Sequence, residues 1–286
     1  MKQLREVSRQ ASGHWVGDGF PVRQLVSIER DAASTSPFLM LDHAGPREFP
    51  PAQTPRGVGA HPHRGFETVT IVYHGEVEHR DTAGNSGVIG PGDVQWMTAA
   101  SGVLHDEFHS RSFTARGGVM EMAQLWVNLP ARHKMDAPRY QGLTTAQIPS
   151  IELAQHAGQV RVIAGEYQGM KGPAQTFSPM NVLDLRLKAG HAATFDAPEG
   201  WNAMLVVLHG AVEVEGQKLA AEEVAHYGRE GKGLALKAVE DTTALILSGQ
   251  PLDEPIAHYG PFVMNTQQEL KQAFADYNSG RFGHLA

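Results

Sequence analysis

The sequence predicts an all-β protein made of two related β units, and three observations support this prediction. Gly (31) and Pro (17) together supply 48 of the 286 residues. They separate short apolar runs at regular intervals, which is typical of many short strands joined by turns. Only 19% of the residues are Asp, Glu, Lys or Arg, which fits strands better than long surface helices. The length favours about two domains over one.

Composition excludes several classes of function. The chain has no cysteine, so disulfides, thiolate catalysis and Cys-based metal sites are ruled out, and any metal must bind to histidines and carboxylates. Its formal net charge of -7 argues against direct nucleic-acid binding, because such binding depends on clustered Lys and Arg.

No segment of the sequence indicates a membrane or secretory protein. Residues 1–6 are charged and lead into no apolar stretch. No run approaches the ~18 apolar residues that a membrane span needs. We therefore expect a protein of the cytoplasm that has no membrane partner.

The clearest strand signal lies at residues 68–73, where alternate residues are apolar and turn signals follow at Gly75, 81–87 and 90–93. This pattern predicts a β-meander or barrel wall. If no bulge intervenes, the same odd-numbered parity reaches back to His61 and His63. Both histidines would then face the barrel interior.

An internal repeat supports two copies of one β unit. Residues 73–78 (YHGEVE) align with residues 208–213 (LHGAVE) at an offset of 135, and an apolar strand precedes each copy. Residues 129–149 are polar and contain prolines, which indicates a connector with room for a short helix. We therefore place the boundary near residue 135, between domains 1–135 and 136–286.

One helix is predicted near the end of the chain. Thr266 is a suitable N-cap with Glu269 three residues later, and Leu270, Phe274 and Tyr277 follow at helical spacing. Asn278-Ser279-Gly280 would end this helix, which we expect to pack on the outside of a barrel.

Four residues form the pattern that carries the predicted chemistry. His61 with His63, and His105 with Glu107, are two i, i+2 pairs, and i and i+2 point to the same side of a strand. On neighbouring antiparallel strands the pairs can direct three imidazoles and a carboxylate to one point, about 2.0 to 2.2 Å from each donor atom. A single pair would more often be structural, but two pairs with a carboxylate predict a metal site.

Other candidates near this pattern are expected to serve other roles. His74 and His79 are expected near strand ends, in solvent, and His109 lies too far along its strand to share the ion. All three are therefore predicted not to be ligands. Arg64 could orient an anion at the mouth of the site or form a surface ion pair. Trp96 is expected in the core.

Five segments resemble the pirin family of the cupin superfamily, and together they span nearly the whole chain. They are residues 59–69 (GAHPHRGFETV), 90–99 (GPGDVQWMTA), 102–107 (GVLHDE), 125–130 (LWVNLP) and 260–266 (GPFVMNT).

The resemblance implies a bicupin, that is, two jelly-roll β-barrels, of which the first holds one divalent metal ion, usually iron. The ligands that it implies are His61, His63, His105 and Glu107, the four that the strand pattern also selects. Glu67 stands where the general cupin motif has its carboxylate ligand. Because pirins use the residue that matches Glu107 instead, Glu67 is expected to support the site or the fold.

The second copy is expected to lack the metal. The offset of 135 places Asp196 and Pro198 at the positions of His61 and His63, and Asn202 at that of Glu67. An offset of 130 places Ala235 and Lys237 opposite His105 and Glu107. At most one plausible ligand survives, so this domain is expected to be structural.

The activity that the resemblance implies is cleavage of quercetin-like flavonols by a quercetin 2,3-dioxygenase-type reaction. Four protein ligands leave two positions open on a six-coordinate ion, enough for a flavonol oxygen and O₂. Three neutral imidazoles and one carboxylate leave a charge near +1 on Fe(II), which stabilises a bound phenolate. Glu107 or a nearby base would accept the proton of the 3-hydroxyl.

A second hypothesis remains open, because eukaryotic pirins are thought to act as regulators. In it, the Fe(II)/Fe(III) state changes the surface, and the protein binds a transcription factor or an enzyme. A roomy cavity leading to the ion and lined by residues such as Phe66 and Trp96 would favour catalysis, whereas a closed one would favour sensing. The resemblance implies Fe(II), and the histidine and carboxylate donors are also compatible with Zn, Mn, Ni or Cu.

Overall fold

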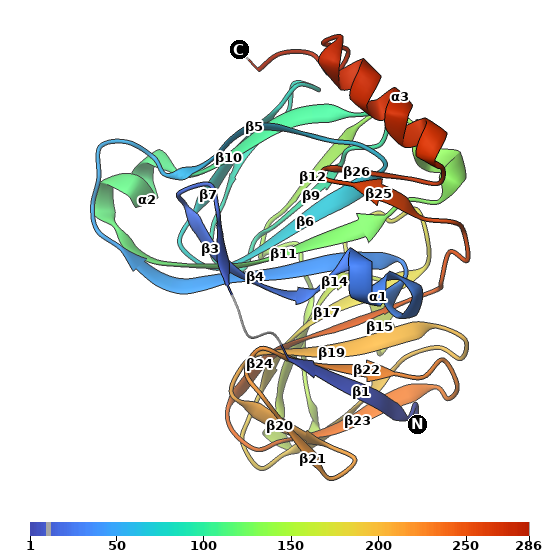
Figure 1. Cartoon of the computed structure of the whole chain (residues 1–286). Coiled ribbons are helices and arrows are strands. Elements are labelled where there is room, and N and C mark those ends of the chain that lie inside the picture. Colours follow the sequence, from blue (N-terminus) through green and yellow to red (C-terminus); the bar gives the residue numbers. More distant parts are fainter. Residues whose placement is uncertain (10–12, 286) are drawn as a thin grey trace. The chain divides into compact units, whose positions relative to one another are not determined.

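Strands make up most of the chain in the computed structural model, which describes residues 1–9 and 13–285. The predicted all-β class is confirmed (Figure 1). Two compact units are present. The histidine unit contains residues 13–23, 41–145 and 253–285, and the second unit contains residues 1–9, 24–40 and 146–252.

The histidine unit is built on two antiparallel sheets. The seven-stranded sheet has, in spatial order, β12 (Arg139–Leu143), β9 (Val94–Thr98), β6 (Phe66–His74), β11 (Gly118–Asn128), β4 (Phe38–Phe49), β3 (Phe20–Val26) and β2 (His14–Val16). The four-stranded sheet has β5 (Gly57–His63), β10 (Val103–His109), β7 (Val77–Asp81) and β8 (Ser86–Ile89).

The second unit repeats this plan. Its seven-stranded sheet has β1 (Leu4–Arg9), β22 (Glu223–Tyr227), β19 (Asn202–His209), β24 (Thr242–Gly249), β17 (Met180–Leu187), β14 (Gly158–Ala164) and β13 (Ser150–Glu152). Its four-stranded sheet has β18 (Ala192–Asp196), β23 (Gly233–Ala238), β20 (Ala211–Val214) and β21 (Gln217–Ala220). Because β19 and β20 take the places of β6 and β7, the repeat predicted from the 135-residue offset is confirmed.

Short elements complete the chain. They are α1 (Ile28–Thr35), α2 (Arg111–Arg116), α3 (Gln267–Asn278), the 3₁₀ turns η1 (Ala131–His133) and η2 (Ala154–His156), and the two-stranded pairs β15 (Glu166–Tyr167) with β16 (Met170–Lys171) and β25 (Ala257–Tyr259) with β26 (Phe262–Met264). None of the helices among residues 1–9 and 13–285 is long and apolar enough to cross a membrane.

The units are not two consecutive stretches of chain. The first nine residues group with residues 146–252, and the C-terminal helix α3 groups with residues 41–145. A single cut near residue 135 describes the two sequence repeats but not this exchange of segments. The division into 1–135 and 136–286 therefore stays a prediction about the repeats.

The predicted helix near the C-terminus is confirmed. Thr266 caps α3, its hydroxyl accepts from the Glu269 backbone, and the Glu269 side chain accepts from the Thr266 backbone, which together form a capping box. Leu270 is buried in a cluster with Phe262 of β26 and Phe282. This cluster secures the end of the chain within the histidine unit.

The condition for carrying the strand parity back from Tyr73 to His61 is not met. The chain leaves β5 at His63 and enters β6 of the other sheet at Phe66. Gly65 makes the turn with a φ of 87°, a conformation that glycine adopts without strain. The inward orientation of the histidines therefore comes from pairing within the four-stranded sheet.

Candidate metal centre

Three adjacent strands of the histidine unit each place an i, i+2 pair of metal-ligating residue types on the same sheet. β5 carries His61 and His63, β10 carries His105 and Glu107, and the next strand, β7, carries His79 and Asp81. His105 lies opposite His61 on one side and opposite Asp81 on the other. Both predicted pairs are therefore on neighbouring antiparallel strands, as the sequence pattern requires.

The imidazoles of His61, His63 and His105 converge. One ring nitrogen of each lies within 4.8 Å of the others, so the three rings can face a single ion. The ring centroids of His61 and His105 are 4.1 Å apart, and each is 4.9 Å from that of His63. His61 can donate from Nδ1 to the Gly59 carbonyl at 2.9 Å, which leaves its Nε2 available.

Burial keeps two of these rings neutral. His63 and His105 are almost completely buried. Desolvation, together with the neighbouring His61, holds the pKa of each well below the ordinary histidine value. A neutral imidazole is the form that binds a metal ion. His61 is only half-buried, so it forms the accessible side of the cluster.

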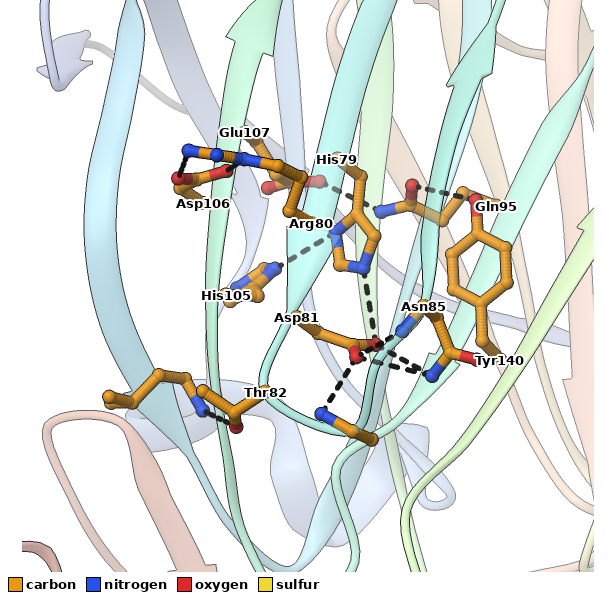
Figure 2. Close-up of polar contacts among 12 residues, drawn as sticks. His79, Arg80, Asp81, Thr82, Asn85, Gln95, His105, Asp106, Glu107 and Tyr140 are labelled. Carbon is orange, nitrogen blue, oxygen red and sulfur yellow. Dashed lines mark hydrogen bonds and ion pairs between the residues drawn. The ribbon is translucent and has the colours of Figure 1, made fainter. Parts of the chain in front are cut away.

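Glu107 is held by neutral donors. Its Oε1 accepts from the Gln95 amide at 3.0 Å, and its Oε2 accepts from the Gln124 amide at 2.9 Å. Tyr140 in turn donates to the Gln95 side-chain oxygen at 3.3 Å, which fixes the Gln95 amide with its NH₂ toward Glu107 (Figure 2). Two neutral amides, rather than a cationic side chain, thus orient the carboxylate through these contacts.

Glu107 groups with a different pair of histidines than the sequence implies. Its carboxylate and the rings of His79 and His105 each offer an atom within 4.8 Å of the others. His105 therefore belongs to both groups. The cluster of His61, His63 and His105 and the group that contains Glu107 meet at this one residue.

The donor atoms of this site fit a divalent metal ion. Nδ1 of His63 and Nε2 of His105 are buried and have no hydrogen-bond partner, a costly state for a polar atom unless another partner occupies it. Imidazole and carboxylate donors suit first-row metals, with Fe, Zn, Mn, Ni and Cu all compatible. A bound ion would therefore supply the missing partner of both nitrogens.

His79 is the residue that sequence reasoning placed wrongly. It was expected in solvent near a strand end, but it is fully buried, and its ring stacks on Tyr140 with centroids 5.1 Å apart. The signal that could have found it is the spacing of His79 and Asp81, which repeats the i, i+2 pattern of the predicted ligands.

His74 and His109 lie outside the histidine cluster, in line with the prediction that they are not ligands. His74 is largely exposed and contacts Glu121 at 3.0 Å. His109 donates to the Gly19 carbonyl at 3.0 Å and packs against Phe49 and Phe113. Neither belongs to the His61, His63 and His105 cluster.

Residues beside the ligand pair support the fold. Burial raises the pKa of Glu67 to about 7, although the Thr98 hydroxyl donates to it at 2.7 Å. Arg64 is buried rather than at the surface, and it pairs with Asp276 of α3 at 2.9 Å. Trp96 lies in the core, as expected, and is fully buried.

The second unit has no comparable set at the equivalent positions. β23 pairs with β18 as β10 pairs with β5, and Ala235 lies opposite Thr194 where His105 lies opposite His61. The strand register therefore matches His61 to Thr194. The expected match to Asp196 was wrong, because the sequence offset between the two repeats is not 135 in this strand. Asp196, opposite Gly233, takes the place of His63. That the second unit binds no metal stays a prediction.

Space beside Glu107 is small. A cavity of about 10 Å³ is lined by Glu107 and Gln124 together with apolar side chains that include Phe20, Val22 and Met122. This is room for about one water molecule, whereas pockets for drug-sized ligands measure roughly 300–1,000 Å³. Neither Phe66 nor Trp96 lines this cavity.

Comparisons with known proteins agree with this architecture. The Pirin family profile matches residues 19–127, and the Pirin C-terminal cupin domain profile matches residues 182–283. The chain is 55% identical to a Pseudomonas aeruginosa protein named "Putative quercetin 2,3-dioxygenase", over 99% of both chains. It is 40% identical to a pirin-like protein of Solanum lycopersicum, over 93% of this chain and 88% of that one.

A solved structure extends the likeness to three dimensions. The crystal structure of a quercetin 2,3-dioxygenase from Acinetobacter baumannii superimposes with a TM-score of 0.98 at 52% identity, over 100% of both chains. The matches cover nearly the whole chain, and they agree with the two cupin domains and with the cluster of His61, His63 and His105. This chain is a bicupin and belongs to the pirin family.

Proposed function

We propose that this protein is an iron-dependent dioxygenase that cleaves quercetin-like flavonols. The observation that carries the proposal is the convergence of three histidines on one point, two of them with buried ring nitrogens that lack a partner. The names of the 55% identical relative and of the 52% identical solved structure support the reaction type.

Four residues would hold the ion, namely His61, His63, His105 and Glu107. A bound divalent ion supplies a Lewis acid that draws a flavonol hydroxyl toward its ionised form and offers a place for O₂. Iron is the metal that we propose, and Zn, Mn, Ni and Cu are the alternatives that the same donors accept.

Glu107 is the proposed catalytic base. Its oxygens already accept from Gln95 and Gln124, so the carboxylate is fixed in position before a substrate arrives. A carboxylate oxygen has more than one acceptor site, and Glu107 can therefore still receive the proton of the flavonol 3-hydroxyl.

The test is an aerobic assay. Iron-loaded protein is mixed with quercetin, and the loss of flavonol absorbance and the release of CO are followed, with His61→Ala as control. We expect turnover that depends on the ion and is lost in the variant. Absence of turnover with iron and with each of the four other metals would refute the proposed activity.

A second candidate function is a metal-dependent redox sensor that binds a protein partner, such as a transcription factor, in the cytoplasm. The cavity that Glu107 lines favours it, since about 10 Å³ does not admit a flavonol on that side of the carboxylate, a side that His61, His63 and His105 do not line. This candidate predicts that partner affinity changes when the iron is oxidised, without consumption of quercetin.

A further inference from the structure

A hydrogen-bonded series of buried side chains runs from the proposed ligand His105 into the sheet. Nδ1 of His105 lies 3.4 Å from Nδ1 of His79, and Nε2 of His79 lies 3.3 Å from Oδ2 of Asp81. Figure 2 shows the three side chains in sequence, with His79 between the other two. His79 and His105 are fully buried and Asp81 is 6% exposed.

The direction of these hydrogen bonds follows from Asp81. Its Oδ1 already accepts from the backbone N–H groups of Ala83 and Asn85, and both oxygens accept from the Asn85 side chain. An ionised carboxylate only accepts, so Nε2 of His79 carries the hydrogen. A neutral ring that donates through Nε2 keeps its lone pair at Nδ1.

The same logic then fixes the hydrogen of His105. Because Nδ1 of His79 can only accept, Nδ1 of His105 must be the donor between the two rings. Nε2 of His105 is left with a lone pair, and this is the buried atom that lacks a hydrogen-bond partner. The series therefore presents a lone pair on the side of His105 away from His79.

We propose that His79 and Asp81 are positioning residues that fix the tautomer of His105, so that its Nε2 is ready to bind a metal ion. This inference rests on the metal site of the proposed function, but not on the dioxygenase reaction. Partners behind a metal-binding histidine raise affinity by orienting the ring and fixing its hydrogen.

Tyr140 links this series to the other proposed ligand. Its ring stacks on His79 at an interplanar angle of 15°, and its hydroxyl donates to Gln95, which holds Glu107. One aromatic side chain thus supports both the histidine behind His105 and the amide behind Glu107. The two ligands of β10 are oriented by one connected group of buried residues.

The discriminating substitution is Asp81→Asn. The amide oxygen can still accept from Ala83 and Asn85, so the turn is kept, but the amide nitrogen can donate to Nε2 of His79. His79 would then carry its hydrogen on Nδ1, and His105 would have to accept there and move its own hydrogen to Nε2. The hydrogen would occupy the atom that binds the ion.

We expect Asp81→Asn to weaken Zn²⁺ binding by about 10–100-fold, measured by competition with a chelating dye. The matched control is Asp106→Asn, which makes the same chemical change on the same sheet. Asp106 pairs with Arg80 at 2.6 Å, and Asp106→Asn is expected to change affinity less than about twofold.

The second readout is ¹⁵N NMR of histidine-labelled, metal-free protein, with the His105 signal assigned by its loss in His105→Gln. The wild type is expected to carry the hydrogen on Nδ1, and Asp81→Asn to carry it on Nε2. A wild-type His105 with its hydrogen on Nε2, or unchanged Zn²⁺ affinity in Asp81→Asn, would overturn the inference.

A second variant covers the case in which Asp81→Asn does not fold. His79→Phe keeps a ring to stack on Tyr140 but removes the acceptor for His105, and we expect it to weaken Zn²⁺ binding by a similar factor. A second Zn²⁺ ion that binds the wild type and is lost in His79→Phe would make His79 itself a ligand and also overturn the inference. A wild type that binds one Zn²⁺ but never cleaves quercetin would refute only the dioxygenase.

Discussion

His105 of β10 lies directly opposite His61 of β5, with the two ring centroids 4.1 Å apart. This pairing joins two segments that are separated by 44 positions in the chain, since 105 − 61 = 44. It depends on the turn at Gly65, which sends the chain from the four-stranded sheet into the seven-stranded one. Local spacing sets each i, i+2 pair, and strand pairing then brings the two pairs together.

Gly65→Ala is expected to destabilise the fold by about 2 kcal/mol or more. Gly65 has a φ of 87°, and an added Cβ would clash with the Val263 carbonyl oxygen, so backbone strain and crowding add. The control is Gly84→Ala, where φ is 89° but nothing lies within 4 Å. Urea unfolding measures both, and equal losses of unfolding free energy would show that crowding at Gly65 is absent.

Removing the amides that hold Glu107 is expected to weaken metal binding. Gln95→Leu and Gln124→Leu each delete one donor to the carboxylate, and we expect about a 10-fold or greater loss of Zn²⁺ affinity. Tyr140→Phe only frees the Gln95 amide and should have a smaller effect. Dye competition gives all three values, and wild-type affinity in both Gln variants would contradict the role assigned to these amides.

Glu67 makes stability fall as pH rises. Burial raises its pKa to about 7 from 4.5, so the folded state binds more protons than the unfolded state between these values. Its contribution is fully present below pH 4.5 and is lost as pH rises through 7. Relative to the wild type, Glu67→Gln should gain up to about 3 kcal/mol of unfolding free energy between pH 4.5 and 8.

Urea unfolding of wild type and Glu67→Gln in metal-free buffer at several pH values gives this difference directly. Glu152→Gln, at an exposed position, serves as the control and should follow the wild type at every pH. Parallel curves for wild type and Glu67→Gln would mean that Glu67 keeps an ordinary pKa.

Asp276→Ala should destabilise the histidine unit by about 3–5 kcal/mol, because it leaves the buried Arg64 guanidinium without its carboxylate. Asp276 also accepts from Gln272 and Arg281 at 2.8 and 2.7 Å. The exposed pair of Lys188 and Asp241 provides the contrast, since Asp241→Ala should change stability much less. Thermal unfolding compares the two, and similar small effects would rule out a structural role for the Arg64 pair.

The fold and the ligand histidines could be predicted because each leaves a local signal. Turn residues mark the strands, the capping box at Thr266 and Glu269 marks α3, and the i, i+2 spacing places His61 with His63 on one side of a strand. Similarity in residues 208–213 also revealed the second unit. None of these signals requires knowledge of which strands are neighbours.

The rest depends on contacts between distant residues. His79 and Asp81 share the spacing of the ligands, but only the order β5, β10, β7 shows that they lie behind His105. Arg64 and Asp276 are 212 positions apart, and no local pattern connects them. The exchange of terminal segments between the units is likewise a property of packing, which periodicity cannot reveal.

Metal content tests the central claim most directly. Protein purified without added metal is analysed for its elements and compared with His105→Gln prepared in the same way. We expect one divalent ion per wild-type chain and loss of that ion in a folded variant. A folded wild type without stoichiometric metal, or a His105→Gln protein that retains the full ion content, would contradict a metal centre at these histidines.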